Sequence, residues 1–167
     1  PYYRLNSTAK RPAWEPYMTF SHILFDVADG IATITLNRPE ARNALSPEMR
    51  IDLDKAMAEI RERAGDDVQA VIMTGAGGAF CAGGDVKSMG SRLGSSTLAR
   101  QALRDSHSNM YDLMNLEVPV VSLVDGPAAG AGANIALAAD FVLATPRAFL
   151  MQAFVKIGLV PDWGGMY

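Results

Sequence analysis

Two glycine-rich segments of the sequence could place backbone N–H groups for chemistry on a carbonyl group. They are residues 80–85 (FCAGGD) and residues 124–140 (VDGPAAGAGANIALAAD). In each, a predicted strand ends, small residues follow, and a helix or turn begins with unpaired N–H donors. Two such donors aimed at one point form an oxyanion hole, which stabilises charge on a carbonyl oxygen. Small residues would let a carbonyl approach closely, but they would equally let a helix pack tightly on a strand, so both interpretations stay open.

The second segment does not match the glycine-rich loops that bind phosphate groups. A Walker loop needs a lysine followed by serine or threonine, and residues 126–140 contain no lysine. The dinucleotide pattern G-x-G-x-x-G begins at Gly130 and Gly132, but Ile135 stands where its third glycine belongs. Both kinds of phosphate site are therefore excluded for this segment.

The composition is that of a globular chain. The 167 residues are 49% hydrophobic and 20% charged, which suffices for one domain with a core. A net charge of −3 makes nucleic acid and anionic membranes poor partners. One cysteine, Cys81, and two histidines provide neither an internal disulfide nor a zinc-binding spacing. No apolar run reaches the roughly 18 residues of a membrane span. We expect a cytoplasmic protein with no metal, no membrane association and no nucleic-acid partner.

The first third of the chain predicts an arm, a hairpin and a helix. Residues 1–20 contain three prolines and no periodicity, so we expect an extended arm before a core at 21–167. Two β-rich runs, 23–27 and 31–36, flank Asp29-Gly30, which is typical of a hairpin turn. Ser46, Pro47 and Glu48 predict the start of a helix, followed by apolar residues at three- and four-residue spacing and ended by Gly65.

The rest of the chain alternates between predicted strands and helices. The expected elements are a strand at 70–74, a mobile Ser/Gly-rich loop at 88–98, a helix at 99–116, a strand at 118–124, a turn at 126–130, a helix at 131–138, and strands at 141–144 and 148–151. This alternation favours an α/β layered fold.

Four segments together resemble the crotonase superfamily, the enoyl-CoA hydratase/isomerase family. Residues 80–89 (FCAGGDVKSM) and 124–140 are similar to its two signature segments, 34–46 (ITLNRPEARNALS) to its CoA-binding turn, and 156–165 (KIGLVPDWGG) to the segment after its active-site strand. The resemblance implies a crotonase-like ββα spiral core. In the family this core continues into a C-terminal helical region that closes the acyl pocket and builds trimers, so we expect a core truncated before that region, and a trimeric or hexameric homo-oligomer for the full-length protein.

The resemblance also implies an acyl-CoA substrate, whose thioester carbonyl would lie between the N–H groups of Gly84 and Ala131. These donors would stabilise an enolate. Because coenzyme A is part of the substrate, no separate cofactor is expected. The implied CoA contacts are Arg42, Ala44, Ala82, Asp85 and Val86. Arg42 could reach a phosphate or be simply solvated, and Asp85 could instead cap the helix that follows.

Two positions depart from the pattern of the hydratases in this family. Asn134 and Phe154 stand where those enzymes carry the two glutamates that handle water, and neither side chain exchanges a proton near neutral pH. Hydration by two carboxylates is therefore not expected. Asn134 could hydrogen-bond to substrate or be an ordinary polar helix residue.

One aspartate suggests a different reaction. Asp162, in VPDWGG (160–165), stands where some family isomerases place their working aspartate, and the chain most resembles the ring-epoxide phenylacetyl-CoA and Δ3,Δ2-enoyl-CoA isomerases. A single carboxylate suits isomerisation, because it removes a proton at one carbon and returns it at another. An apolar pocket with Phe154 and Trp163 would raise its pKa. Asp162 could also be an ordinary turn residue after Pro161. Hydration by another acid, and acyl-CoA binding without catalysis, remain the alternatives.

Overall fold

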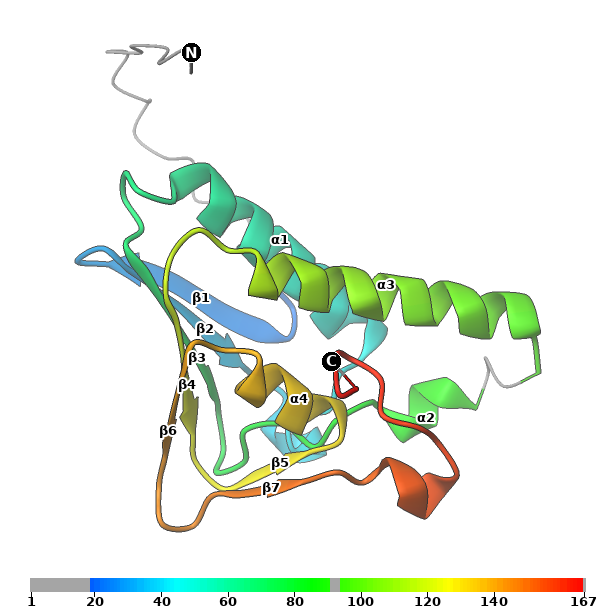
Figure 1. The fold of residues 1–167 in the computed structure, drawn as a ribbon. Coiled ribbons are helices and arrows are strands. Elements are labelled where there is room, and N and C mark those ends of the chain that lie inside the picture. The colour runs from blue at the N-terminus through cyan, green and yellow to red at the C-terminus, as the bar shows by residue number, and fades with distance from the viewer. Residues whose placement is uncertain (1–18, 91–93, 167) are drawn as a thin grey trace.

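A mostly parallel five-stranded sheet forms the centre of the computed structural model, which describes residues 19–90 and 94–166 (Figure 1). The strands are β1 (Ile23–Ala28), β2 (Ile31–Leu36), β3 (Ala70–Gly75), β4 (Val120–Val124) and β6 (Phe141–Ala144), in the order β1-β2-β3-β4-β6. Only β1 runs antiparallel to its neighbour. The predicted hairpin is confirmed, with positive φ angles of 51° at Asp29 and 80° at Gly30 in its turn. The predicted arm lies almost entirely outside the described residues.

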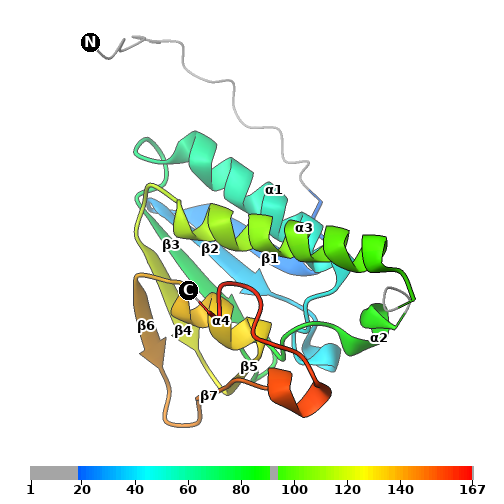
Figure 2. The same cartoon turned by 45° about the vertical axis from the view of Figure 1, so that its right-hand side comes forward.

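Helices α1 (Pro47–Arg63) and α3 (Ser96–Met114) lie side by side over the sheet, with α1 packed on β1 and β2 (Figures 1 and 2). The predicted start of α1 is confirmed, because the Ser46 hydroxyl accepts a hydrogen bond of 3.2 Å from the N–H of Met49. Its apolar stripe is confirmed as well, since Met49, Leu53 and Ile60 are buried. After α1 the chain turns at Gly65, whose φ is 79°.

A second, two-stranded sheet pairs β5 (Pro127–Ala129) with β7 (Phe149–Met151), and helix α4 (Ala131–Leu137) lies between the two sheets. The prediction of a turn at 126–130 was therefore wrong. Proline and alanine are poor strand formers, but residues from other parts of the chain pair with both sides of β5. It lies parallel to β7 on one side, and on the other its carbonyl and N–H groups bond to Phe80 and Cys81.

The loop predicted at 88–98 is shorter than expected. Helix α2 (Val86–Met89) precedes it, and α3 already begins at Ser96. Side chains cap both helices: Asp85 accepts from the N–H of Lys87 at 3.1 Å, and Ser95 accepts from the N–H of Leu98 at 3.4 Å. These local caps outweigh the glycine and serine content that suggested a loop. Two single-turn 3₁₀ helices, η1 (Pro39–Ala41) and η2 (Phe154–Ile157), complete the described elements.

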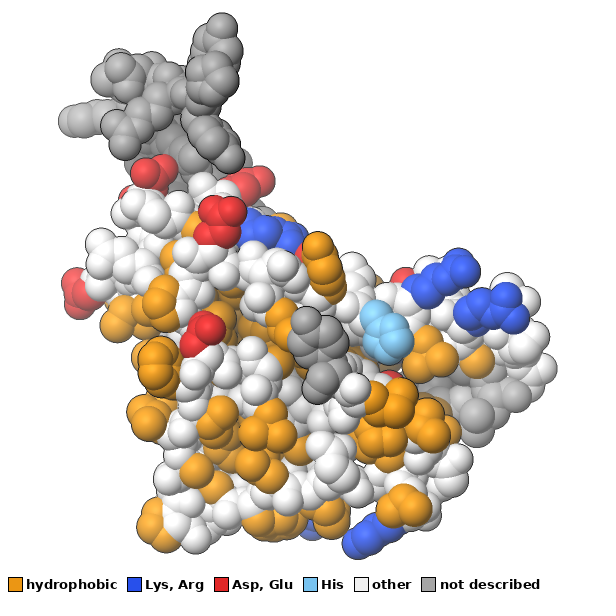
Figure 3. All heavy atoms as spheres, viewed as in Figure 1, with side chains coloured by type: hydrophobic (Ala, Val, Ile, Leu, Met, Phe, Trp, Pro, Cys, Tyr) orange, Lys and Arg blue, Asp and Glu red, His pale blue; other side chains and the backbone are white. Residues whose placement is uncertain are grey.

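The predicted α/β layering is confirmed. The one cysteine of the sequence, Cys81, lies in the core. Its side chain is fully buried, and burial raises the pKa of the thiol to about 12. Cys81 therefore behaves as a small apolar residue. In contrast, apolar side chains are exposed over β6, β7 and the end of α4, on the face seen in Figure 3. They include Leu137, Phe141, Leu143, Phe149 and Leu150.

Candidate active site

The two glycine-rich segments lie against each other, as the oxyanion-hole hypothesis requires. Backbone N–H groups of Phe80 and Cys81 donate to the carbonyl oxygen of Pro127 at 2.9 and 3.2 Å, and the N–H of Ala129 donates to Cys81 at 2.9 Å. These bonds fix the two segments in register. We call this pairing the glycine junction; it comprises residues 80–84 and 127–132.

Glycine is required where the junction is closest. Gly83 has a φ of +92°, and a Cβ added there would lie 2.6 Å from the carbonyl oxygen of Ala129 and 3.5 Å from the nitrogen of Ala131. The first of these distances is too short for any side chain. The small residues thus serve close backbone approach, and this approach places the Gly83-Gly84 turn beside the start of α4.

Both predicted donors are available at this junction. Ala131 is the first residue of α4, and Gly130, with φ 52° and ψ −124°, turns the chain from β5 into the helix. Among the described residues, neither the N–H of Gly84 nor that of Ala131 donates a hydrogen bond within the protein. Two free donors on neighbouring segments are what an oxyanion hole needs.

A cavity of about 250 Å³ opens beside Gly84, between this turn, α3 and the C-terminal segment. Its wall is mainly apolar, with side chains that include Leu45, Met89, Ala99, Leu103, Leu159 and Val160. Four of the predicted site residues line it: Gly84, Asp85, Asp162 and Trp163. Ala131 is part of the junction and Phe154 lies against Gly130; both are buried, and neither lines the cavity.

The carboxyl group of Asp162 lies partly buried at the cavity wall. Burial raises the pKa of this carboxyl above the ordinary value, and a hydrogen bond from the residue's own backbone N–H and the charges of His107 and Arg50 oppose this only in part. The predicted direction of the shift is thereby confirmed. Its Oδ1 atom is buried and has no hydrogen-bond partner among the described residues. Trp163 lines the same cavity and is only 4% exposed, so an aromatic wall adjoins the carboxyl.

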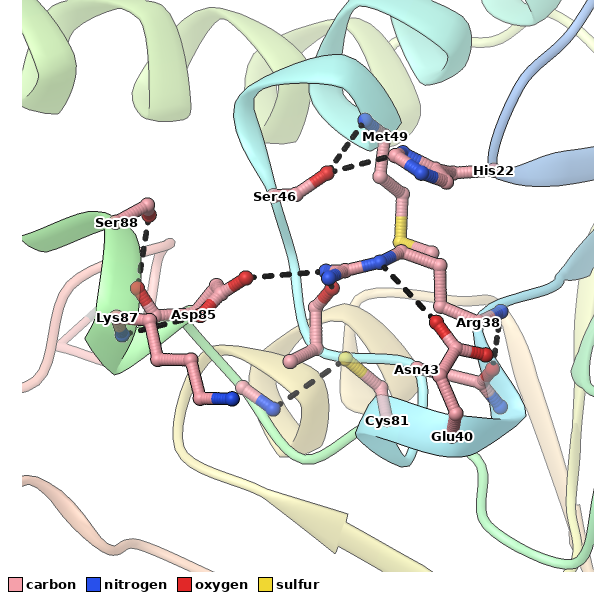
Figure 4. Close-up of polar contacts among 12 residues, drawn as sticks. His22, Arg38, Glu40, Asn43, Ser46, Met49, Cys81, Asp85, Lys87 and Ser88 are labelled. Atoms are coloured by element: carbon pink, nitrogen blue, oxygen red, sulfur yellow. Dashed lines mark hydrogen bonds and ion pairs between the residues drawn. The ribbon is translucent and has the colours of Figure 1, made fainter.

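Asp85, the other acidic side chain of the cavity wall, is already engaged (Figure 4). One carboxylate oxygen caps α2, and the other accepts from Nη1 of Arg38 at 3.2 Å. The capping role considered for Asp85 is therefore confirmed. Arg38 also donates to the carbonyl oxygen of Ala44 at 2.8 Å, so it ties the turn at 38–45 to the start of α2.

Asn43 holds the same turn to residues 76–79, which lead into the glycine junction. It is fully buried, and its Nδ2 donates to the carbonyl oxygens of Ala76 and Ala79, both at 2.8 Å. Its Oδ1 accepts from the N–H of Arg38 at 2.8 Å. Sequence reasoning missed both Arg38 and Asn43, because the bonds of Arg38 to Asp85 and of Asn43 to Ala76 and Ala79 span more than 30 residues and leave no local pattern.

The implied CoA contacts fall on two adjoining segments, 42–44 and 82–86. The N–H of Ala82 donates to the carbonyl oxygen of Arg42 at 2.9 Å, and Arg42, Ala82 and Val86 are exposed. None of these three lines the cavity, which leaves their contact with CoA a prediction.

The structure gives Asn134 a role other than the predicted substrate contact. Its Nδ2 donates to the carbonyl oxygen of Asp162 at 2.7 Å, and its Oδ1 accepts from Nε2 of Gln152 at 2.7 Å. Both polar ends of the amide are thus used within the protein, and Asn134 does not line the cavity. It fastens the C-terminal segment to α4, where the two lie side by side in Figure 2, and so positions Asp162.

We expect Asn134→Ala to lower the free energy of unfolding by about 1–3 kcal/mol, because the carbonyl oxygen of Asp162 and the amide of Gln152 each lose a partner. Denaturant unfolding measures this. Asn115→Ala is the matched control, since Asn115 is exposed and its side chain makes one bond among the described residues, to the carbonyl oxygen of Tyr111. Equal effects of the two substitutions would contradict the positioning role.

Within residues 19–90 and 94–166 no group of three or more His, Cys, Asp and Glu side chains could hold a metal ion. In the same residues, no helix combines the length and apolarity needed to cross a membrane.

Comparison with known proteins places these features in a family context. Residues 26–167 match the family model described as enoyl-CoA hydratase/isomerase. The chain is 40% identical over 151 residues to a probable enoyl-CoA hydratase of Rhodobacter capsulatus, covering 90% of this chain and 56% of that protein. It is 37% identical over 147 residues to the 1,2-epoxyphenylacetyl-CoA isomerase of Escherichia coli, covering 87% of this chain and 55% of that protein. It therefore spans about half the length of the curated relatives it matches.

Several solved structures that are similar to this chain carry the same family description. The crystal structure of a putative enoyl-CoA hydratase from Streptomyces coelicolor superposes with a TM-score of 0.85 at 34% identity, covering 96% of this chain and 59% of that one.

Proposed function

The chain belongs to the enoyl-CoA hydratase/isomerase family and has its crotonase-like α/β fold, and from this we propose that the protein isomerises an unsaturated acyl-CoA by moving one proton with Asp162. The observation that carries the proposal is that the two acidic side chains at the cavity wall differ in their hydrogen-bond partners. Asp85 is bound to Arg38 and to the N–H of Lys87, whereas Asp162 keeps a buried oxygen without a partner and a raised pKa.

Isomerisation needs one base that acts at two carbons. The thioester carbonyl would accept from the N–H groups of Gly84 and Ala131. The Asp162 carboxylate would remove a proton from the carbon next to the carbonyl, which leaves an enolate stabilised by these two donors. The protonated Asp162 would then return the proton to the far carbon of the former double bond. The apolar wall supports this route by keeping water from the enolate.

Hydration is the second candidate, because the curated relative from Rhodobacter capsulatus is named a probable enoyl-CoA hydratase. The residues of the cavity wall argue against it: no glutamate is among them, and positions 134 and 154 carry Asn and Phe. For the full-length protein we further propose a homo-oligomer, a trimer or hexamer, that acts on acyl-CoA and needs no other cofactor.

The test uses the complete gene product with two substrates. With a 3-enoyl-CoA, we expect the absorbance of the conjugated thioester to appear; with a 2-enoyl-CoA, we expect it to persist apart from equilibration with the 3-isomer. Complete loss of the conjugated absorbance, with a 3-hydroxyacyl-CoA as product, would establish hydration instead. Binding of both compounds without exchange of their α-protons into deuterated water would identify a non-catalytic relative.

A further inference from the structure

A second cavity, of about 490 Å³, lies between α1 and α3 directly behind the candidate active site. Its wall includes the apolar side chains of Pro47, Ile51 and Leu98 and the polar ones of Asp54, Gln101, Asp105 and Asn109. Two residues, Arg50 of α1 and Ala102 of α3, line both cavities. They therefore form the partition between the two spaces.

The partition is held in place by a hydrogen-bonded chain. Nη1 of Arg50 donates to the hydroxyl of Ser106 at 3.0 Å, and that hydroxyl donates to the carbonyl oxygen of Ala102 at 2.7 Å. Ser106 is only 4% exposed and lines the first cavity. The guanidinium group thus extends from α1 to α3 and is fixed at its end by a buried hydroxyl.

An acyl chain that filled the first cavity would meet this guanidinium group next. To go further it would have to displace Arg50 from Ser106 and place CH₂ groups against a charge, which is unfavourable. Beyond the partition the second cavity again offers apolar surface, since Ile51 is 54% exposed and Leu98 is 55% exposed. The space for a longer chain exists, and the arginine separates it from the active site.

We propose that Arg50 is a specificity-determining residue that ends the acyl pocket and excludes acyl chains longer than the first cavity. This inference rests on the proposed function, because it assumes that the first cavity takes the acyl group of an acyl-CoA. Arg50 acts here through its size, its charge and its bond to Ser106, and it transfers no proton.

The test is a series of dissociation constants for unreactive saturated ligands, measured by calorimetry on the complete gene product. Butanoyl-, octanoyl-, dodecanoyl- and hexadecanoyl-CoA are compared. In the unmodified protein we expect affinity to rise with chain length and then to stop rising where the pocket ends. In Arg50→Ala we expect the rise to continue by roughly fourfold for each further CH₂ group that is buried. The hexadecanoyl-to-octanoyl affinity ratio should increase by about tenfold or more.

Three further variants test the partition by other means. Ser106→Ala removes one hydrogen-bond partner of Arg50 and should give a smaller shift in the same direction. Adding Ala102→Met to Arg50→Ala should refill the opening and restore the original limit. Arg61→Ala is the matched control: Arg61 also lies on α1 and pairs with Asp112 of α3, but it lines neither cavity. It should leave the length limit unchanged.

The outcomes separate this inference from the proposed function. An unchanged limit in both Arg50→Ala and Ser106→Ala would overturn the role of Arg50, while binding itself would still support an acyl-CoA site. The same shift in Arg61→Ala would show that looser packing of α1 on α3 is the cause, which also overturns it. No binding of any chain length by the unmodified protein would overturn the proposed function and this inference together.

Discussion

Asp162→Asn in the complete gene product should reduce turnover in the proposed isomerisation by a factor of about 10²–10⁴, the usual contribution of a positioned general acid–base group. The amide has nearly the size of the carboxyl but cannot take up a proton, so the expected loss is in turnover rather than in ligand binding. Calorimetry with a saturated acyl-CoA should give a dissociation constant within a few-fold of the original. A variant that keeps its turnover would remove Asp162 from the mechanism.

The pH dependence of turnover provides a second measurement of the same role. Proton abstraction needs the ionised carboxylate, so turnover should fall on the acid side as the pH drops through the pKa of Asp162. Because burial raises that pKa, the fall should begin above the range expected for an ordinary aspartate with a pKa of about 4. Asp85→Asn removes the other carboxylate of the cavity wall. In this variant, turnover should fall on the acid side at the same pH as in the unmodified protein.

Stability should change in the opposite sense to activity. A raised pKa means that the folded state binds the proton of Asp162 more tightly than the unfolded state does. This group's contribution to stability therefore falls as the pH rises from the unfolded pKa through the folded one, and at neutral pH the ionised form is unfavourable. Asp162→Asn should consequently be at least as stable as the original in denaturant unfolding at pH 7. Clear destabilisation would indicate that the carboxylate has a structural role instead.

Gly132→Ala should disrupt the glycine junction. An added Cβ would overlap the carbonyl oxygen of Cys81 and lie 2.7 Å from its Cβ and 2.8 Å from its Sγ. The Cys81 backbone cannot easily move away, because its carbonyl accepts from the N–H of Ala129. We expect the free energy of unfolding to fall by about 1–3 kcal/mol or more, as for overpacked cores.

Activity should fall with it, because the same displacement separates Gly84 from Ala131. Gly90→Ala is the matched control, since Gly90 is exposed and an added Cβ would find its nearest neighbour, the carbonyl oxygen of Lys87, at 4.0 Å. Its effect on stability should stay within about 0.5 kcal/mol. If both alanine variants unfold at the same denaturant concentration, then the stability of the junction does not depend on the absence of a side chain at position 132.

Features set by neighbouring residues could be predicted from the sequence. The start of α1 follows from Ser46 and Pro47, and the hairpin follows from Asp29-Gly30 between two β-rich runs. Strand β5 could not be predicted in this way, because its strand conformation comes from pairing with β7 and with residues 80–81. Local composition at Pro127–Ala129 indicates only a turn.

In the candidate site, too, some features could be predicted from the sequence and others could not. Family resemblance predicted roles for the two segments of the junction and for Asp162, and the structure brings Gly84 and Asp162 to one cavity. The sequence could not indicate that Asn134 bonds to Asp162, or that Arg38 and Asn43 hold the turn at 38–45. These bonds link residues far apart in the chain. Arg50 was missed because, within α1, nothing distinguishes it from a solvated arginine.

Because Cys81 is buried inside the glycine junction, its reactivity with thiol reagents can report local opening of that junction. Cys81 is the one cysteine of this sequence, it lies inside the junction, and at a pKa of about 12 almost none of it is thiolate at neutral pH. A thiol reagent can reach the buried sulfur only when the junction opens, and it then reacts with the thiolate form. The rate of alkylation of Cys81 would therefore measure the free energy of local opening at this one place, in the way that hydrogen exchange does for backbone amides.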